Sequence, residues 1–96
     1  MALTNEPLTQ AEARKLMREI VATGTVSFSQ HAIDELTKDK LTQADAVNAI
    51  KAGAVEPAEF ERGSWRYRVH TVRVWVVVVF RSLTQLVVVT AWKVGR

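Results

Sequence analysis

Three basic side chains occupy alternate positions of one short segment. Arg66, Arg68 and His70 are each separated by a single residue, and side chains two residues apart in a β-strand point to the same face of the sheet. They predict a basic stripe about 13 Å long, enough to contact two adjacent phosphates. Cross-strand neighbours lie about 5 Å apart, so a following strand could widen the stripe with Arg73 or Arg81.

The alternative is a solvated strand face on which the arginines only keep the sheet soluble. Ordinary solvated faces mix charges of both signs, whereas no acid is interleaved with this stripe in the sequence. This difference favours the prediction that the stripe binds an anion.

A histidine at the expected start of a helix is the second candidate for chemistry. Ser29 can cap that helix, which places His31 in its first turn. Exposed backbone amides and the helix dipole there attract phosphate and favour the neutral imidazole, which could act as a general base toward a ribose 2′-hydroxyl. A histidine that only hydrogen-bonds near the cap is the alternative. Late in the chain, Thr90 and Lys93 could add a hydroxyl and a cation.

Aromatic residues accompany these groups. Trp65, Tyr67, Trp75 and Trp92 could stack on bases, as aromatic side chains do in single-strand RNA recognition. Aromatic residues at alternate strand positions more often belong to the core. Because Trp65 and Tyr67 share the apolar parity of their segment, we expect these two in the core.

Local signals predict the helices that would carry part of this site. Thr9 and Glu12 form a capping box, and apolar residues recur at helical spacing until Gly24. Further helices are expected over about residues 29–38 and 42–53. The intervening residues 25–28 are short and β-prone.

The second half of the chain changes from helical to alternating periodicity. Strands are expected over residues 55–61, 64–71, 73–81 and 86–94, joined by turns at 62–63 and 82–85. Short links of this kind favour an antiparallel meander. We therefore predict one α+β domain over residues 1–96, in which about three N-terminal helices pack on a four-stranded antiparallel sheet. Its parts are an N-terminal helix in 1–24, a helical segment in 25–54 and the sheet in 55–94.

Charge is distributed unevenly over the 96 residues. Residues 1–61 hold six Lys/Arg against ten Asp/Glu, and residues 62–96 hold six Arg and one Lys with no acid, within an overall net charge of +3. A domain polarised in this way is expected to present a basic surface to a polyanion or to an acidic partner protein. The chain has no cysteine and two histidines, so no metal or other cofactor is expected. We expect a soluble cytoplasmic protein, because no signal-peptide pattern and no apolar run near about 20 residues is present.

Residues 26–93 resemble an uncharacterised family of small bacterial proteins close to the BrnT, MqsR and RelE-like toxins of toxin–antitoxin systems. The matching residues are Phe28-Ser-Gln-His-Ala32, Leu36, Leu41-Thr42, Asp45-Ala-Val47, Ile50, Lys51-Ala-Gly53 and Leu86-Val-Val-Val-Thr-Ala-Trp92. The resemblance implies a RelE-like fold, metal-independent cleavage of mRNA by 2′-hydroxyl attack, and an antitoxin that masks the site. It assigns the family histidine to His31, RNA contacts to Arg66 and Arg68, and the late hydroxyl to Thr90.

The chain departs from the family at two positions. Glu35 and Asp39 stand where many members have arginine, and acids facing the site would repel phosphate. Three functions are therefore considered. The first is a toxin-type endoribonuclease in which phosphates contact Arg66, Arg68 and Arg73, while His31 or His70 moves the proton. The second is a non-catalytic module, an inactive toxin homologue that docks an acidic antitoxin-like partner. The third is RNA binding without cleavage. A homodimer through the sheet edges is compatible with each.

Overall fold

The chain forms three helices and six strands over residues 5–95, the part that the computed structural model describes. The capping boxes of Thr9 with Glu12 and of Thr42 with Asp45 begin the first and third helices. In chain order the elements are α1 (Gln10–Thr23), β1 (Thr25–Phe28), α2 (Gln30–Lys38), α3 (Gln43–Ala52), β2 (Ala54–Val55), β3 (Glu59–Glu61), β4 (Ser64–His70), β5 (Val74–Ser82) and β6 (Gln85–Lys93).

All six strands join one mixed sheet. Its order is β1-β6-β5-β4-β2, and β3 pairs with β4 next to β2. β1 runs parallel to β6, and the other pairs are antiparallel. The α+β class is confirmed, whereas the prediction of a four-stranded antiparallel sheet is wrong.

Two local features explain the additional strands. Pro57 has no N–H to donate, and the segment expected as one strand over 55–61 divides there into β2 and β3. The β-prone residues of β1 pair with residues far along the chain, Thr25 with Gln85 and Phe28 with Val88. A parallel pairing over such a separation leaves no local signal in the sequence.

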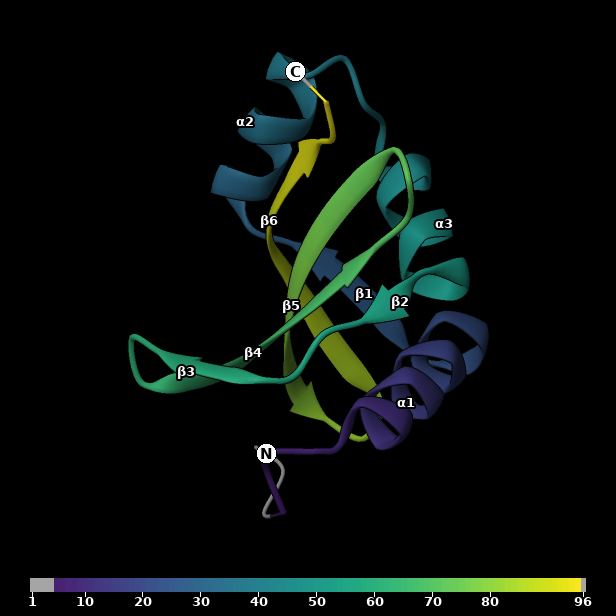
Figure 1. Ribbon diagram of the computed structural model, residues 1–96, viewed down its shortest axis with the longest axis vertical. Coiled ribbons are helices and arrows are strands. Elements are labelled where there is room, and N and C mark those ends of the chain that lie inside the picture. The colour runs from purple at the N-terminus through teal and green to yellow at the C-terminus, as the bar shows by residue number, and fades with distance from the viewer. Residues whose placement is uncertain (1–4, 96) are drawn as a thin grey trace.

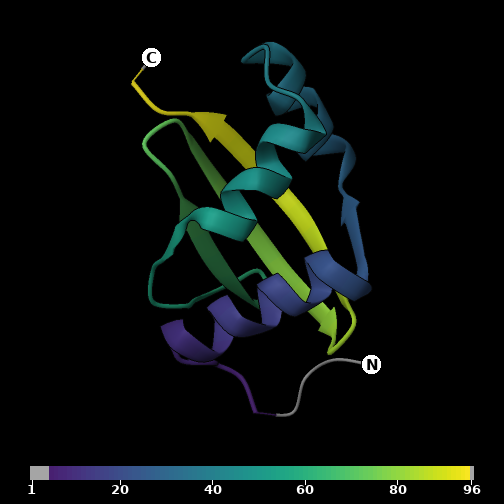
Figure 2. The same cartoon turned by 90° about the vertical axis from the view of Figure 1, so that its right-hand side faces the viewer.

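The core lies between one face of the sheet and the helices α1 and α3, which cross that face together (Figure 2). The apolar stripe of α1 is buried as expected, at Ala13, Leu16, Met17 and Ile20. Both aromatic residues of β4 that were predicted to lie in the core face it: Tyr67 is fully buried, and Trp65 is partly buried and packs against the same cluster.

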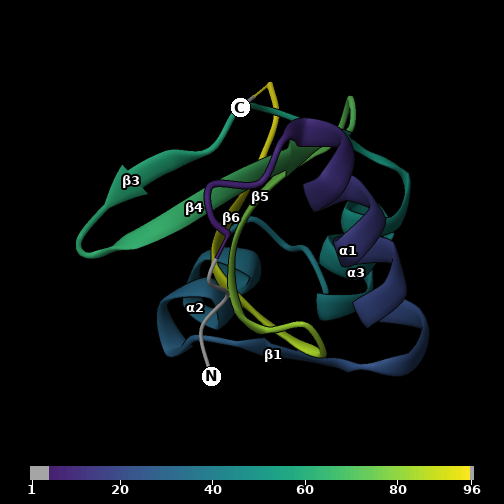
Figure 3. The same cartoon turned by 90° about the horizontal axis from the view of Figure 1, so that it is seen from below.

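The opposite face of the sheet carries neither α1 nor α3. Helix α2 packs against β6 and, like the β3–β4 hairpin, lies on the side away from α1 and α3 (Figures 1 and 3). The strand surface between α2 and the hairpin is called the uncovered face below. In register across β4, β5 and β6, it presents His70 with Trp75 and Trp92, then Arg68 with Val77 and Thr90, then Val79 with Val87.

A glycine secures the connection between α3 and the sheet. A Cβ added at Gly53 would lie 2.6 Å from the carbonyl oxygens of both Ala49 and His70. Only a residue without a side chain allows the end of α3 to approach β4 this closely. Among the described residues, no helix has the length and apolar character needed to cross a bilayer.

Candidate functional site

A depression of about 340 Å³ on the uncovered face brings together residues from α2, the β3–β4 hairpin and strands β4, β5 and β6. Four of the residues predicted to act in a site meet there: His31, Arg66, Arg68 and Thr90. The complete lining is His31, Glu61, Arg62, Arg66, Arg68, Val77, Val89, Thr90 and Trp92.

The position of His31 depends on the start of α2. As predicted, Ser29 caps this helix, because its hydroxyl accepts a hydrogen bond from the backbone N–H of Ala32 at 3.0 Å. The same hydroxyl donates to the carbonyl oxygen of Val89 at 3.0 Å. The Ser29 cap therefore ties the first turn of α2, with exposed His31 on it, to strand β6.

Strand β6 is irregular at this contact. Val77 pairs with Thr90 and the next residue, Val78, pairs with Val88, so Val89 is an extra residue in β6. A β-bulge of this kind leaves the extra residue unpaired and re-aims its neighbours. Here the bulge offers the Val89 carbonyl to Ser29 and places Val89 and Thr90 together in the lining of the depression.

Arg66 has an unsatisfied polar group. Its side chain is half-buried, and its Nε is buried without a hydrogen-bond partner in the described part of the chain. A buried donor that lacks an acceptor costs about 1–3 kcal/mol, more when the group is charged. An anion in the depression would provide that acceptor, since guanidinium groups bind carboxylate and phosphate oxygens.

The rest of the basic stripe is interleaved with acids, contrary to the sequence prediction. Arg68 forms an ion pair with Glu59 of β3, and His70 Nε2 lies 2.8 Å from a carboxylate oxygen of Glu56. The sequence of the stripe did not reveal these acids because they belong to the acidic half of the chain: Glu59 lies on β3 beside β4, and the backbone N–H of Glu56 donates to the carbonyl oxygen of Arg68. The Arg68–Glu59 pair is well exposed, at 36% and 52% of the side chains, so it contributes only about 0–1 kcal/mol.

His70 does not line the depression. Its ring stacks on Trp75 with centroids 4.1 Å apart, and Trp75 lies parallel to Trp92 at 5.9 Å. The three rings form a row across β4, β5 and β6 on the uncovered face. Trp92 belongs both to this row and to the lining of the depression, so an aromatic surface adjoins the site of His31 and Arg66.

The remaining predicted cations lie elsewhere. Arg73 sits at the β4–β5 turn near α3, in a different depression lined also by Asp45. Hydrogen bonds from Thr42 lower the pKa of the Asp45 carboxyl, and the charge of Arg73 lowers it further. Lys93 is exposed at the end of β6 and does not line the depression of His31.

The two acids that replace family arginines also lie outside this lining. Asp39 accepts a hydrogen bond from the backbone N–H of Lys93 at 2.8 Å, and Glu35 is half-buried on α2. Neither contributes to the surface that His31 and Arg66 share. The expected repulsion of phosphate by these acids therefore has no basis in the lining.

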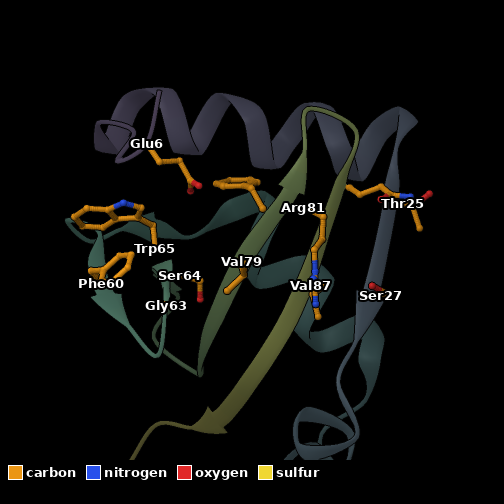
Figure 4. Close-up of a pocket in the computed structure, with 12 residues that line it drawn as sticks. Glu6, Thr25, Ser27, Phe60, Gly63, Ser64, Trp65, Val79, Arg81 and Val87 are labelled. Carbon is orange, nitrogen blue, oxygen red and sulfur yellow. The ribbon is translucent and has the colours of Figure 1, made fainter. Parts of the chain in front are cut away.

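Arg81 lines a larger cavity of about 670 Å³ farther along β5 and β6, where Val79 and Val87 of the uncovered face meet Trp65 and Phe80, which also belong to the core side. Figure 4 shows Arg81, Val79 and Val87 on the strands, with Trp65 and Phe60 across from them on the hairpin. Phe60 and Trp65 meet edge to face with ring centroids 5.2 Å apart. The other residues of the lining are Glu6, Thr25, Ser27, Gly63, Ser64, Phe80 and Gln85.

Sequence reasoning missed Glu61 and Arg62, which line the depression. The sequence carried a signal for them, because the turn expected at Arg62 and Gly63 is a two-residue hairpin connection that pairs the flanking residues directly. In the structure both residues adopt the positive φ of such a turn, 50° and 82°. That turn sets Glu61 opposite Ser64 and Glu59 opposite Arg66. Side chains paired in this way share a face of the sheet, so the acids were predictable neighbours of the stripe.

Comparisons with models of protein families, with curated protein sequences and with solved structures find no match for this chain. Among the described residues, no three histidine or acidic side chains gather in a way that could hold a metal ion.

Proposed function

We propose that this protein binds single-stranded RNA on the uncovered face and cleaves it by attack of a ribose 2′-hydroxyl on the adjacent phosphate. The observation that carries the proposal is the meeting of His31 and Arg66 in one depression, although they come from a helix and a strand far apart in the chain. An imidazole beside a guanidinium is a combination suited to proton transfer at a bound phosphodiester.

Arg66 is the phosphate-binding residue in this proposal. Its buried Nε has no partner among the described residues, and a phosphate oxygen in the depression would satisfy it. The hydroxyl of Thr90 lines the same depression and can donate to a second oxygen. Charge that develops on the phosphate oxygens in the transition state would strengthen both contacts.

Glu61 and His31 supply the proton transfers. Both line the depression, and a carboxylate with an imidazole provides one acceptor and one donor. One of them takes the proton of the 2′-hydroxyl as the bond between O2′ and phosphorus forms. The other protonates the 5′ oxygen as its bond to phosphorus breaks. The products are a 2′,3′-cyclic phosphate and a 5′-hydroxyl end.

The aromatic row of His70, Trp75 and Trp92 is the reason for proposing single-stranded rather than duplex RNA as the ligand. Trp92 lines the depression and lies parallel to Trp75, so a base next to the bound phosphate can stack beside these rings. Bases inside a duplex are not free to do so. In the class of toxins that residues 26–93 resemble, this activity acts on mRNA in the cytoplasm, and we propose the same RelE-like role here, with an antitoxin-like partner masking the face.

The test is incubation of the purified protein with a labelled RNA in EDTA, followed by analysis of the ends. Wild type is expected to release fragments with 2′,3′-cyclic phosphate, and a strand with 2′-deoxyribose at the cleaved position should stay intact. His31→Ala is expected to lose at least about 100-fold in rate, the usual scale for one acid–base group. His70→Ala, the histidine outside the depression, should retain the cleavage rate at saturating protein, because its ring belongs to the aromatic row and affects RNA affinity only. Intact RNA with wild type, or equal rates for His31→Ala and wild type, would refute the proposal.

A second candidate function is non-catalytic docking of an acidic protein segment. The observation in its favour is that Arg68 and His70 already contact carboxylates, Glu59 and Glu56, which an acidic partner could replace. In that case RNA would be neither cut nor bound. A glutamate-rich peptide would then bind wild type and lose affinity for the Arg66→Glu variant in calorimetry.

A further inference from the structure

The larger cavity adjoins the depression along β5 and β6. On β5, Val77 lines the depression and Val79 lines the cavity; on β6, Val89 and Val87 divide in the same way. The two residues of each pair stand two positions apart on their strand, so their side chains point to the same side of it. The β3–β4 hairpin also borders both, through Glu61 and Arg62 in one and through Phe60, Gly63, Ser64 and Trp65 in the other. The two hollows therefore lie side by side along β5 and β6, and together they are called the track below.

We infer that the larger cavity is a second subsite of this track, which binds a base and a phosphate of the same RNA strand at a distance from the cleaved bond. The inference rests on the proposed function and adds the length and the single-stranded state of the substrate. We assign a nucleotide to this cavity because its lining contains two aromatic side chains, Phe60 and Trp65, that can stack on a base, and a cation, Arg81, that can bind a phosphate.

Phe60 and Trp65 form the aromatic wall. Phe60 is a large apolar side chain that is 58% exposed, and its ring contacts Trp65 edge to face. This exposure leaves the Phe60 ring available for contact with a ligand. Aromatic faces of this kind stack on any base, which gives affinity without strict sequence preference.

Arg81 is the cation of the subsite. It is exposed and has no hydrogen bond or ion pair with another described residue, unlike Arg68. Figure 4 shows its side chain extended along the strands toward Val87, across the cavity from Trp65. The single carboxylate in the lining, Glu6, accepts a hydrogen bond from the Tyr67 hydroxyl at 3.0 Å. A phosphate bound to Arg81 therefore meets a guanidinium that no carboxylate already holds.

The register sets the distance between the two subsites. Arg68 pairs with Val77 and Tyr67 with Val78, so the same register carries Arg66 toward Val79, and Arg81 lies two residues farther along β5, about 7 Å at the rise of a strand. This exceeds one nucleotide step of about 3.4 Å in a stacked strand, and a dinucleotide has a single phosphodiester, which cannot contact both Arg66 and Arg81. A dinucleotide should thus occupy only the depression, and an octanucleotide should occupy both hollows.

The experiment measures competition of a dinucleotide and an octanucleotide, each with 2′-deoxyribose at the cleaved position, against a labelled RNA octamer. Wild type is expected to bind the octanucleotide at least about tenfold more tightly than the dinucleotide, as one stacked base contributes. Phe60→Ala and Arg81→Gln should each weaken octanucleotide binding about fivefold to tenfold and leave dinucleotide binding unchanged. Leu83→Ala and Arg14→Gln, exposed residues outside both linings, are the matched controls.

The outcomes separate the two proposals. If wild type binds RNA and Arg66→Gln weakens both oligonucleotides, while Phe60→Ala and Arg81→Gln leave both unchanged, the second subsite is refuted and the proposed function stands. Equal competition by a duplex of the same sequence would also refute it, because duplex bases cannot reach Phe60. If wild type binds neither oligonucleotide, the proposed function fails and this inference fails with it.

Discussion

The hydroxyl of Ser29 donates a hydrogen bond to the carbonyl oxygen of Val89 at 3.0 Å, joining the first turn of α2 to the β-bulge of β6. The backbone N–H of Ser29 donates to the neighbouring carbonyl of Val88 at 2.9 Å. These two bonds connect the helix that carries His31 to the strand that carries Thr90. The position of His31 over the depression therefore depends on these two hydrogen bonds of Ser29.

Ser29→Ala should loosen the attachment of His31. Loss of the cap and of the bond to Val89 is expected to lower the free energy of unfolding by about 1–2 kcal/mol. RNA cleavage should fall further than that loss explains, because the His31 ring is no longer held over the depression. Urea denaturation and single-turnover cleavage measure the two effects. Ser29→Thr keeps a capping hydroxyl and should restore most of both; equal cleavage by Ser29→Ala and wild type would show that the cap does not position His31.

Glu59→Gln should release Arg68 for phosphate. Because the exposed ion pair contributes about 0–1 kcal/mol, the variant should fold with nearly wild-type stability. Its affinity for single-stranded RNA should rise, and the plot of log affinity against log salt concentration should steepen by about 0.7, the value for one added phosphate contact. Glu19→Gln, an exposed acid on α1, serves as the control. An unchanged salt slope would exclude Arg68 from the binding face.

Tyr67→Phe should alter stability in a pH-dependent way. Burial raises the pKa of Tyr67 from 10.0 to about 12, with the Leu8 N–H acting in the opposite direction and the Glu6 carboxylate reinforcing the rise. Between pH 10 and 12 the unfolded chain loses the phenolic proton while the folded chain keeps it, so this contribution to stability is complete below pH 10 and is lost as the pH rises toward 12.

The variant removes that dependence and also the two bonds of the hydroxyl. At neutral pH it should be less stable than wild type by about 1–3 kcal/mol, since the buried Leu8 N–H loses its acceptor. The difference in unfolding free energy between wild type and variant should then shrink as the pH rises from 10 to 12. Urea denaturation at a series of pH values measures this; a difference that stays constant would contradict the assigned pKa.

Gly53→Ala should be the more damaging of two glycine substitutions. Its Cβ would lie 2.6 Å from the carbonyl oxygens of Ala49 and His70, both backbone atoms, so the end of α3 must shift at a cost of about 1–3 kcal/mol or more. Gly63→Ala meets no atom within 4 Å and is strained only by its φ of 82°, which costs about 1–2 kcal/mol. Thermal unfolding of both variants gives the comparison. A smaller loss for Gly53→Ala would show that α3 can move away from β4.

The local elements were predictable because their signals lie within a few residues. Thr9 with Glu12 and Thr42 with Asp45 satisfy the first N–H groups of their helices through side chains three residues apart. Alternation in β4 correctly assigned Tyr67 to the core and Arg66 to the other face. The turn at Arg62 and Gly63 even contained the register that places Glu59 opposite Arg66.

The sequence by itself thus determined the helices, most strand positions and the facing of the Arg66 stripe, since these follow from periodicity and capping. Only the tertiary structure decided that β1 pairs in parallel with β6, that Glu59 neutralises Arg68, and that His31 joins Arg66 while Arg73 and Arg81 lie elsewhere. The physical reason is range. Capping and alternation act between neighbours in the chain, whereas the depression forms where the Val89 bulge meets the Ser29 cap, two segments that only the folded sheet brings together.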